Sequence, residues 1–438
     1  MRVLWAAVFW YGEGRATRAA VARCAWPRWE RWPAGAAPAR VLLVADPQLV
    51  DDHTYPGRPA RLMRLTEFFV DRYMRRAWRA MAAGLPSDAV VFLGDLFDGG
   101  REWPHDQWLA EYRRFARVFP PAAVAGRTVV YSVAGNHDIG LGDTVVRPAL
   151  DRFRAYYGEP SVAFDVGNHT LVALDTDSLM NTNDEGVYGP PRALLDQLAE
   201  QRALGDHRAA RPRVLLTHIP LYRLPDTACG PKRESRSAIR IARGHQYQNV
   251  VDPGLSEEVL AKIQPVAVFS GDDHDACLVH HTFDGGAGAV SVPEYTVKSL
   301  SIAMGIQYPA FEMLSLHAPS PAGATLDPGT AQAHLCGLPS QFDLFRLYGQ
   351  VAVLTVAAAV YAVWRRRRVH PHRQSSFGDK ALLPPLPRTA RPSAAARALA
   401  YVDVVAGRPG TFRRDVADQL AAIGWVASAV FAYYLATV

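Results

Sequence analysis

AVVFLGDLFD, residues 89–98, joins an apolar run of strand length to the motif Gly94-Asp95-Leu96-Phe97-Asp98. The run predicts a buried β-strand, and the motif places two carboxylates directly after it. Four other short motifs stand in the same position after an apolar run. They are Asp46-Pro47-Gln48, Gly135-Asn136-His137-Asp138, Thr217-His218 and Gly271-Asp272-Asp273-His274-Asp275. Because ligand sites of α/β sheets gather at strand ends, the five motifs predict one shared site.

Short apolar runs alternate with helical patterns from Arg40 onward, which predicts an α/β fold with a sheet core covered by helices. The expected buried strands are Val41–Ala45, Ala89–Leu93, Thr128–Val133, Val214–Thr217 and Val266–Ser270. The expected helices are Arg61–Ala83, Asp106–Val118, Pro191–Leu204 and Ser256–Ile263. A hairpin is expected from Val162–Asp165 and Leu171–Leu174, and Val279–Phe283 and Ala289–Val297 predict further antiparallel strands.

The donor atoms of the five motifs suit a pair of divalent cations. Two cations about 3.5–4 Å apart can hold a phosphoryl group and lower the pKa of a water molecule between them. A ligand shared by both cations must be a carboxylate or a similar group, which Asp95 provides. His137 carries an imidazole that can give a proton to a leaving alkoxide, and Asp98 can fix its tautomer. One such Asp alone is typical of a turn or a helix cap, whereas the convergence of all five motifs predicts a metal site.

Over residues 40–300 the chain resembles the calcineurin-like metallophosphoesterase superfamily. The superfamily pattern is Asp-x-His, Gly-Asp-x-x-Asp, Gly-Asn-His-Asp/Glu, a lone His, and Gly-His-x-His. The resemblance implies a metallophosphoesterase sandwich of two mixed β-sheets flanked by helices, with two divalent metal ions. It implies that Asp95 bridges the two ions and that His137 is the catalytic histidine, oriented by Asp98. The other implied ligands are Asp46, Gln48 and His274 at the first ion, and Asn136, His218 and Asp272 at the second.

Two of these ligand positions differ from the superfamily pattern. Gln48 stands where the first motif usually has His, and Asp272 stands where the last motif usually has its first His. One interpretation is a decayed site. Both replacements still carry an oxygen that can coordinate a metal, however, and a site richer in oxygen favours Mn²⁺ over Zn²⁺. Gln48 is a weak ligand, and binding through a water molecule is the alternative.

The same departures resemble one branch of the superfamily, the GPI ethanolamine-phosphate phosphodiesterases. This branch contains the fungal cell division control protein 1 type and the animal metallophosphoesterase that acts after GPI attachment to proteins. The stretches that resemble it are ADPQLVDDHTYPGRP (45–59), GDLFDGGRE (94–102), SGDDHD (270–275) and TVKSLSIAMGIQYPAF (296–311). The resemblance implies a Mn²⁺-dependent enzyme that removes an ethanolamine-phosphate side branch from a mannose of the GPI-anchor glycan. The alternatives are a luminal metallophosphatase for another phosphomonoester or lipid-linked phosphodiester, and a catalytically inactive, membrane-bound binding module.

Four further side chains are candidates for contact with the substrate. His53 and Arg58 lie on a loop rich in Pro and Gly, Arg101 can meet a phosphate oxygen, and Lys298 follows a predicted strand. A solvated surface role is the alternative for each. Asp273 or Asp275 can pair with a substrate ammonium group, and Asp275 can alternatively orient a metal ligand.

The formal net charge of +6 does not indicate a nucleic-acid partner, because the charge is concentrated near the C-terminus. From Leu344 onward there are 13 Lys/Arg against 4 Asp/Glu. Leu347–Trp364 is an uncharged run with the length of a membrane-spanning helix, and Leu420–Val438 is a second. The basic segment between them predicts a cytoplasmic linker, which places the motif-bearing part of the chain in the lumen.

The expected organisation is a multi-pass protein of the endoplasmic reticulum, ER-Golgi or Golgi membrane, acting on GPI-anchored proteins. Its predicted segments are 1–19, the remainder of a membrane anchor or a signal sequence; 20–38, a Trp-rich membrane-proximal segment; 39–317, the luminal domain; 318–343, a linker; 344–364, a transmembrane helix; 365–416, a basic cytoplasmic linker; and 419–438, a second transmembrane helix. All four cysteines fall in the predicted luminal part. There they form disulfides, whose pairing the sequence does not rank, or remain free thiols.

Overall fold

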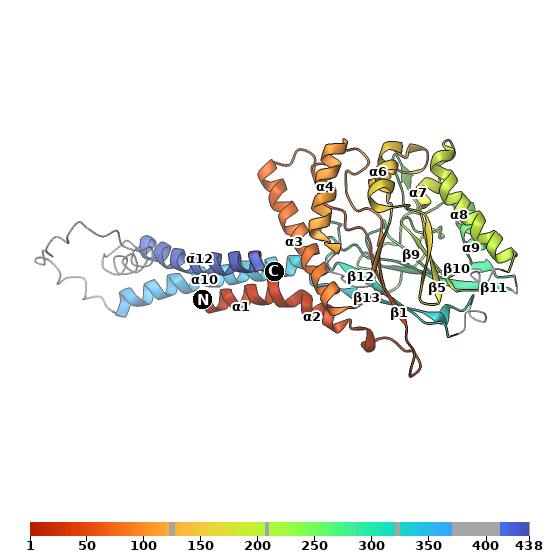
Figure 1. The fold of residues 1–438 in the computed structure, drawn as a ribbon. Helices are drawn as coiled ribbons and strands as arrows, with labels where there is room; N and C mark the ends of the chain where they lie inside the picture. The colour runs from red at the N-terminus through yellow and green to blue at the C-terminus, as the bar shows by residue number, and fades with distance from the viewer. Residues whose placement is uncertain (122–127, 206–209, 287, 320–324, 370–411, 438) are drawn as a thin grey trace, which may run out of the picture. The chain divides into compact units, whose positions relative to one another are not determined.

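The computed structural model describes residues 1–121, 128–205, 210–286, 288–319, 325–369 and 412–437. The chain divides into two compact units. One unit is Thr17–Gln341, which carries all five motifs, and the other combines Met1–Ala16 with Phe342–Val438. Figure 1 labels the helices and strands of both units.

Two mixed β-sheets form the centre of the Thr17–Gln341 unit. Among the described residues, the first sheet has five strands in the order β13-β12-β1-β2-β3, and the second has six in the order β10-β11-β9-β6-β5-β4. The first sheet comprises β13 Ala331–Gly337, β12 Ala310–Leu316, β1 Ala39–Val44, β2 Ala89–Leu93 and β3 Val129–Val133. The second comprises β10 Cys277–Asp284, β11 Ala289–Thr296, β9 Pro265–Ser270, β6 Arg213–Thr217, β5 His169–Leu174 and β4 Val162–Val166. Neighbours are parallel within β1-β2-β3 and within β11-β9-β6-β5, whereas β12, β13, β10 and β4 pair antiparallel with their neighbours.

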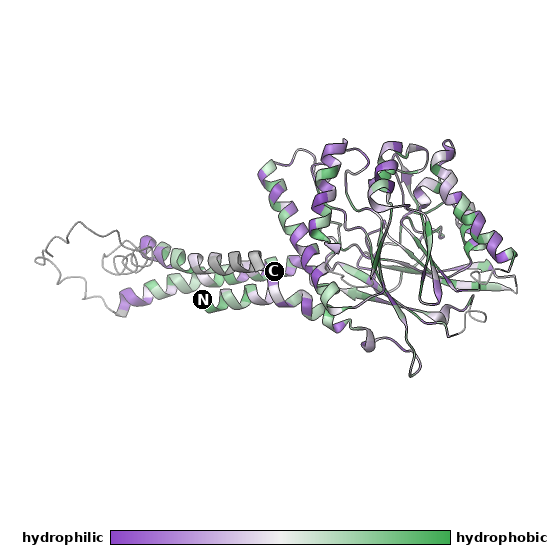
Figure 2. Ribbon diagram, in the orientation of Figure 1, coloured by the Kyte–Doolittle hydropathy of each residue, from purple (hydrophilic) through white to green (hydrophobic). Residues whose placement is uncertain are grey.

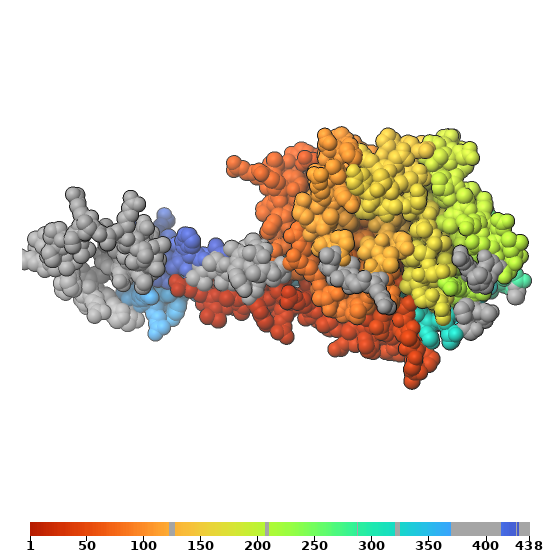
Figure 3. Space-filling view, in the orientation of Figure 1, coloured from red at the N-terminus to blue at the C-terminus, as the bar shows by residue number. Residues whose placement is uncertain are grey.

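Helices cover the outer faces of both sheets, so the predicted fold class is confirmed (Figure 1). The longer helices are α3 Ala60–Gly84, α4 His105–Val118, α6 Arg147–Tyr157, α8 Glu185–Ala203 and α9 Pro253–Ile263. The shorter elements are α2 Ala16–Arg23, α5 Asn136–Ile139, α7 Thr176–Leu179, the hairpin of β7 Arg243–Gly244 and β8 Tyr247–Gln248, and 3₁₀ turns at Trp26–Arg28, Gly142–Thr144 and Pro328–Thr330. In the space-filling view, segments coloured from orange to yellow-green make up most of the visible face of this unit (Figure 3).

The unit has four layers, in the order helices, sheet, sheet and helices, and the alternation of side chains along the strands explains them. In β1, Leu42 and Val44 pack in the cluster formed with α3 and α4, whereas Val41 and Leu43 pack between the two sheets. The second sheet does the same, since its outward residues join a cluster with α8 and α9. Because successive side chains of a strand point to opposite faces, an unbroken apolar run buries both faces at once. Figure 2 shows apolar stretches in the strands and a mixture of apolar and polar residues along the helices that cover them.

Two expected boundaries are wrong. The segment 318–343, expected to be a linker, contains β13, which pairs antiparallel with β12 along its whole length. Its sequence AQAHLCG is too small and polar to show the apolar pattern of a strand. Helix α8 begins at Glu185, six residues before the expected start at Pro191, because the side chain of Asp184 caps its first turn and the helix accommodates Pro190 and Pro191.

The Trp-rich segment 20–38 packs against the edge of the first sheet. Trp26 is buried, Trp29 stacks on His334 of β13, and the Trp32 indole donates a hydrogen bond to Ser315 of β12. A disulfide between Cys24 and Cys336 fastens the segment to the same edge, and Cys229 pairs with Cys277. The segment is therefore part of the folded unit that carries the site.

The second unit is helical. It contains α1 Arg2–Phe9, the π-helix Trp10–Arg15, most of α10 Gln341–Val369, and α12 Phe412–Thr437. Within it, the Trp5 indole donates to Thr355 at 3.0 Å and the Tyr348 hydroxyl donates to Glu13 at 2.8 Å. These bonds attach the N-terminal helix to α10.

One helix of the described residues, Gln341–Arg368, is long and apolar enough to cross a membrane. Figure 2 shows its apolar course and the polar stretch at its end. The helix α12 takes the place of the second expected span, and its crossing of the membrane stays a prediction. Most of the expected basic linker 365–416 lies outside the described residues.

The Cys24–Cys336 disulfide should contribute strongly to stability, because it links residues separated by 312 positions and so restricts the unfolded chain. We expect Cys24→Ser to lower the free energy of unfolding by about 2–5 kcal/mol. Thermal unfolding of the purified, non-reduced protein measures the change. Cys336→Ser and the double variant should lose the same amount as the single variant. A double variant that is much less stable than either single one would contradict the pairing.

Candidate active site

The five motifs follow the carboxyl ends of β1, β2, β3, β6 and β9, and the structure brings their side chains together. Several of the predicted ligands have a left-handed backbone that non-glycine residues rarely adopt. The φ angles are +44° at Asp46, +31° at Gln48, +49° at Asp95, +64° at Asp272 and +66° at His274. Each such residue costs on the order of 1–3 kcal/mol and persists only where the surrounding structure enforces it. The strain lies where the chain must turn sharply to aim donor atoms at one point.

The first group of donors consists of Asp46, Asp95 and His274, whose ligand atoms lie within 4.8 Å of one another. The Asp46 carboxylate is fully buried, and its Oδ2 has no hydrogen-bond partner among the described residues. Gln48 lies beside this group. Its Nε2 donates to Asp98 Oδ1 at 2.8 Å, while its buried Oε1 likewise has no partner within the described part of the chain.

The second group of donors surrounds His218. Its Nδ1 donates to the Leu93 carbonyl oxygen at 2.7 Å, which leaves Nε2 to face the other donor groups. Burial opposes the charged form of this ring, but Asp95, Asp177 and Asp46 around it raise its pKa well above the usual range, so a cation would displace a proton from Nε2. That nitrogen lies 3.2 Å from Asn136 Oδ1, 3.4 Å from Asp95 Oδ1 and 3.8 Å from Asp272 Oδ1. Asn136 is oriented by its Nδ2, which donates to the Gln246 carbonyl oxygen at 2.8 Å. Four donor atoms therefore face one point, and Asp95 belongs to both groups.

The chemistry of these donors fits two divalent cations. Burial raises the pKa of Asp46 well above its usual range, and it raises that of Asp272 to about 7, with a further contribution from the Asp95 charge. Burial also lowers the pKa of His274 to about 4, so this imidazole is neutral at physiological pH. Buried carboxylates in this number need a compensating charge. Oxygen donors without partners and a neutral imidazole such as that of His274 are ligands that such cations take.

Two further buried carboxylates, which have no predicted role, lie close enough to the donors to interact with their charges. Asp138 accepts hydrogen bonds from the backbone N–H groups of Leu96, Phe97 and Gly135 at 3.0–3.2 Å, and so ties the second motif to the third. Asp177 in α7 is fully buried, and neither of its oxygens has a partner in the described ranges. Beside it, the Thr176 hydroxyl lies 3.1 Å from that of Thr217. The position of Asp177 shortly after β5 could have indicated a site residue, since the five motifs also follow strands.

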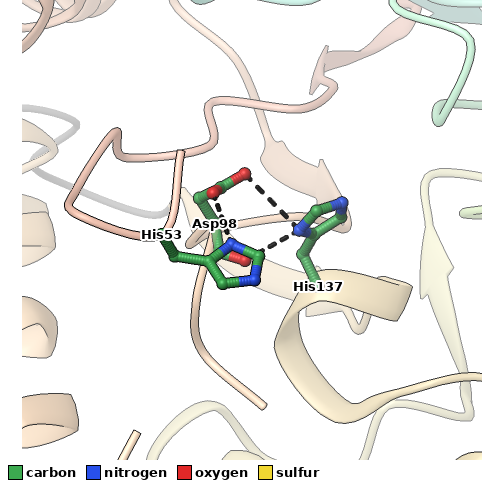
Figure 4. A group of neighbouring side chains, drawn as sticks. All are labelled: His53, Asp98 and His137. Carbon is green, nitrogen blue, oxygen red and sulfur yellow. Dashed lines mark hydrogen bonds and ion pairs between the residues drawn. The ribbon is translucent and has the colours of Figure 1, made fainter. Parts of the chain in front are cut away.

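A third group joins His53, Asp98 and His137 (Figure 4). Asp98 Oδ2 accepts from His53 Nδ1 at 2.8 Å, and its backbone oxygen accepts from His137 Nδ1 at 2.7 Å. The Asp98 carboxylate lies 3.4 Å from His137 Nδ1, farther than a normal hydrogen bond. His137 is thus oriented mainly by the carbonyl group of Asp98, and its Nε2 remains available.

The other predicted contact residues have partners within the protein. Arg58 stacks over Tyr55 and donates to Thr66. Arg101 donates to the Asn136 backbone oxygen at 3.0 Å, which supports the third motif. Lys298 is buried and pairs with Glu234 and Asp275. These are contacts within the protein, and the contact of the three side chains with a substrate stays a prediction.

The prediction that Asp273 or Asp275 meets a substrate ammonium group does not fit the structure. Arg233 forms a bidentate ion pair with Asp273. Asp275 Oδ2 accepts hydrogen bonds from the backbone N–H groups of Glu234 and Ser235 at 2.8 Å. The Cys229–Cys277 disulfide anchors the same loop beside the last motif. These contacts hold the turn that carries Asp272 and His274.

Comparison with known proteins defines the family. The sequence model of the calcineurin-like phosphoesterases matches residues 39–276, more than half of the chain. The chain is 44% identical to Cell division control protein 1 of Saccharomyces cerevisiae, over 79% of this chain and 70% of that protein. It is 26% identical to the Metallophosphoesterase 1 homolog of Drosophila melanogaster, over 82% and 90% of the two chains, and 28% identical to Metallophosphoesterase 1 of Mus musculus, over 64% and 68%.

The chain therefore belongs to the calcineurin-like phosphoesterase family and is a metal-dependent phosphoesterase. These relatives confirm the predicted branch by its members, the fungal cell division control protein 1 type and the animal metallophosphoesterase.

Removal of the cations should make stability depend on pH. Burial raises the pKa values of Asp138 and Asp272 to about 7, with a contribution from the Asp95 charge in each case. The folded protein then binds these protons more tightly than the unfolded chain, where a free Asp has a pKa of about 3.9. The stability that these groups contribute is therefore complete below about pH 4 and is lost as pH rises through about 7.

We expect chelator-treated protein to unfold at a lower temperature at pH 7.5 than at pH 5.5, with Mn²⁺ raising the midpoint more at pH 7.5. Because cations compete with protons for carboxylate oxygens, Mn²⁺ should stabilise the protein more at the higher pH. Differential scanning fluorimetry at both pH values measures it. Identical midpoints with and without Mn²⁺ would contradict a cation site here.

Proposed function

We propose that the protein is a Mn²⁺-dependent phosphodiesterase that removes an ethanolamine-phosphate side branch from a mannose of the GPI-anchor glycan. The observation that carries the proposal is the convergence of two donor groups on Asp95, with Gln48 and Asp272 supplying oxygen where histidine is usual in the superfamily. The resemblance of residues 45–59, 94–102, 270–275 and 296–311 to the GPI-editing branch supports the substrate.

The residues divide the work as follows. Asp46, Gln48 and His274 would hold the first cation, Asn136, His218 and Asp272 the second, and Asp95 both. When bound, the pair would neutralise the phosphate charge and make water more acidic. His137 keeps a proton on Nδ1 through its bond to the Asp98 carbonyl group. In the imidazolium form Nε2 carries a second proton, which it can give to the leaving alkoxide, and the ring is then neutral with its remaining proton on Nδ1.

We further propose a multi-pass protein of the endoplasmic reticulum or Golgi membrane with a luminal catalytic unit. Both disulfides support an oxidising compartment. The membrane-length helix Gln341–Arg368 ends in Arg365-Arg366-Arg367-Arg368, which favours a cytoplasmic position for that end. GPI glycans are exposed on the luminal side, where the site would meet them.

Purified full-length protein with Mn²⁺ should release ethanolamine phosphate from isolated GPI glycans, and His137→Ala should lower turnover by about 10²–10⁴-fold because the leaving group loses its proton donor. Mass spectrometry of the glycans measures the loss and shows which mannose is edited. His105→Ala, at an exposed histidine of α4, is the matched control and should keep full activity. Turnover of phosphomonoesters without turnover of the glycan would contradict the proposed substrate.

The metal preference should depend on Asp272. Replacing it with the histidine usual at this position adds a softer nitrogen ligand, so Asp272→His should shift the preference from Mn²⁺ toward Zn²⁺. Competition of the two ions for the chelator-treated protein, followed by metal analysis, measures the ratio. A variant with the metal ratio of the wild type would show that Asp272 does not set the preference.

A further inference from the structure

Gln48 presents a problem of orientation. A glutamine side chain ends in an amide whose oxygen can bind a cation and whose nitrogen cannot. Only one of the two orientations of the amide group therefore presents the oxygen to a cation. A histidine at this position would need only the correct tautomer. The backbone of Gln48 is fixed, since its N–H donates to the Asp95 carbonyl oxygen at 2.8 Å. What remains to be fixed is the rotation of the amide group.

The Asp98 carboxylate fixes that rotation. An ionised carboxylate only accepts hydrogen bonds, and Asp98 Oδ1 lies 2.8 Å from Gln48 Nε2. The opposite amide orientation would bring two oxygens together at that distance. The bond therefore directs Oε1 away from Asp98, and this oxygen is buried without a partner among the described residues.

Asp98 is in turn held by His53. Asp98 Oδ2 accepts from His53 Nδ1 at 2.8 Å, as Figure 4 shows, so both carboxylate oxygens have a donor. The His53 loop is itself anchored by Asp51, which accepts from the N–H of His53 at 2.6 Å and from the N–H of Gly99 at 3.2 Å. The side chains of His53, Asp98 and Gln48 thus form a continuous hydrogen-bonded series from a partly exposed histidine to a buried amide.

His137 does not need this carboxylate. Its Nδ1 is bound to the Asp98 backbone oxygen at 2.7 Å, a bond that any residue at position 98 can provide. The carboxylate lies 3.4 Å from the same nitrogen, while both of its hydrogen bonds of 2.8 Å go elsewhere. The side chain of residue 98 thus serves Gln48 and His53 first.

We propose that Asp98 and His53 are positioning residues for Gln48, turning its amide oxygen toward the first cation and so allowing glutamine to replace histidine as a ligand. The proposal rests on the two-cation site of the proposed function. It assigns the Asp98 side chain to the orientation of a metal ligand and leaves the orientation of His137 to the backbone.

The test is a double-mutant cycle on Mn²⁺ affinity, measured as free Mn²⁺ by electron paramagnetic resonance during titration of the full-length protein. Loss of a hydrogen-bond partner of a metal ligand typically costs about 10–100-fold in affinity, and we expect this loss at one of the two sites in Asp98→Asn. An asparagine side chain can accept through its oxygen or donate through its nitrogen, so it no longer selects one orientation of Gln48. His137→Ala is the control and should leave both affinities unchanged.

The second half of the cycle uses Gln48→His, which needs no amide orientation. In that background Asp98→Asn should cost little affinity, because coupled residues show non-additive effects. His53→Ala should weaken the same site as Asp98→Asn. His53→Asn, whose amide nitrogen can replace Nδ1 as a donor, should restore it.

The proposal is overturned if Asp98→Asn binds two Mn²⁺ ions with the affinities of the wild type. It is also overturned if the substitution costs the same affinity with histidine at position 48 as with glutamine. Failure of the wild-type protein to bind two ions would instead remove the two-cation site itself, and would be recognised before any variant is made.

Discussion

Buried negative charge at the ends of the strands is the constraint on which the rest of the site depends. Asp46, Asp95 and Asp177 are buried and Asp272 is nearly so, around His218, whose pKa is raised, and beside His274, whose imidazole is neutral. Removing several carboxylates from water costs far more free energy than one imidazole can return. The sandwich tolerates them because two rigid sheets hold the turns in place and because the same oxygens can bind cations. The left-handed backbone at the ligand positions follows from this convergence.

Oxygen ligands in place of histidine change what the surrounding residues must do. A histidine ligand is oriented by a bond from its second ring nitrogen, as His218 is by the Leu93 carbonyl group. An amide ligand instead needs an acceptor for its nitrogen, and a carboxylate ligand needs a turn that is held in place. Gln48 obtains this support from Asp98 and His53, and the turn that carries Asp272 is held by the Arg233 ion pair and the nearby disulfide. The loops near the site are thus part of the metal chemistry although they supply no ligand.

Much of the fold could be predicted because β1, β2, β6 and β9 are buried on both faces and read as continuous apolar runs. β13 could not, since a small and polar edge strand shows no such pattern and is defined only by its pairing with β12. The predicted ligands come together because each follows a strand. The roles of Lys298 and Asp273 escaped prediction because their partners Glu234 and Arg233 lie on an irregular loop, and nothing in a sequence pattern specifies which loop will pack beside a strand end.

Anomalous diffraction from crystals grown with Mn²⁺ tests the two-cation site most directly. The account predicts two anomalous peaks, one bounded by Asp46, Gln48 and His274 and the other by Asn136, His218 and Asp272, with Asp95 between them. It also predicts that the Gln48 amide oxygen, rather than its nitrogen, faces the first peak. A single peak, or a peak between His53 and His137 with none beside Asp95, would contradict it.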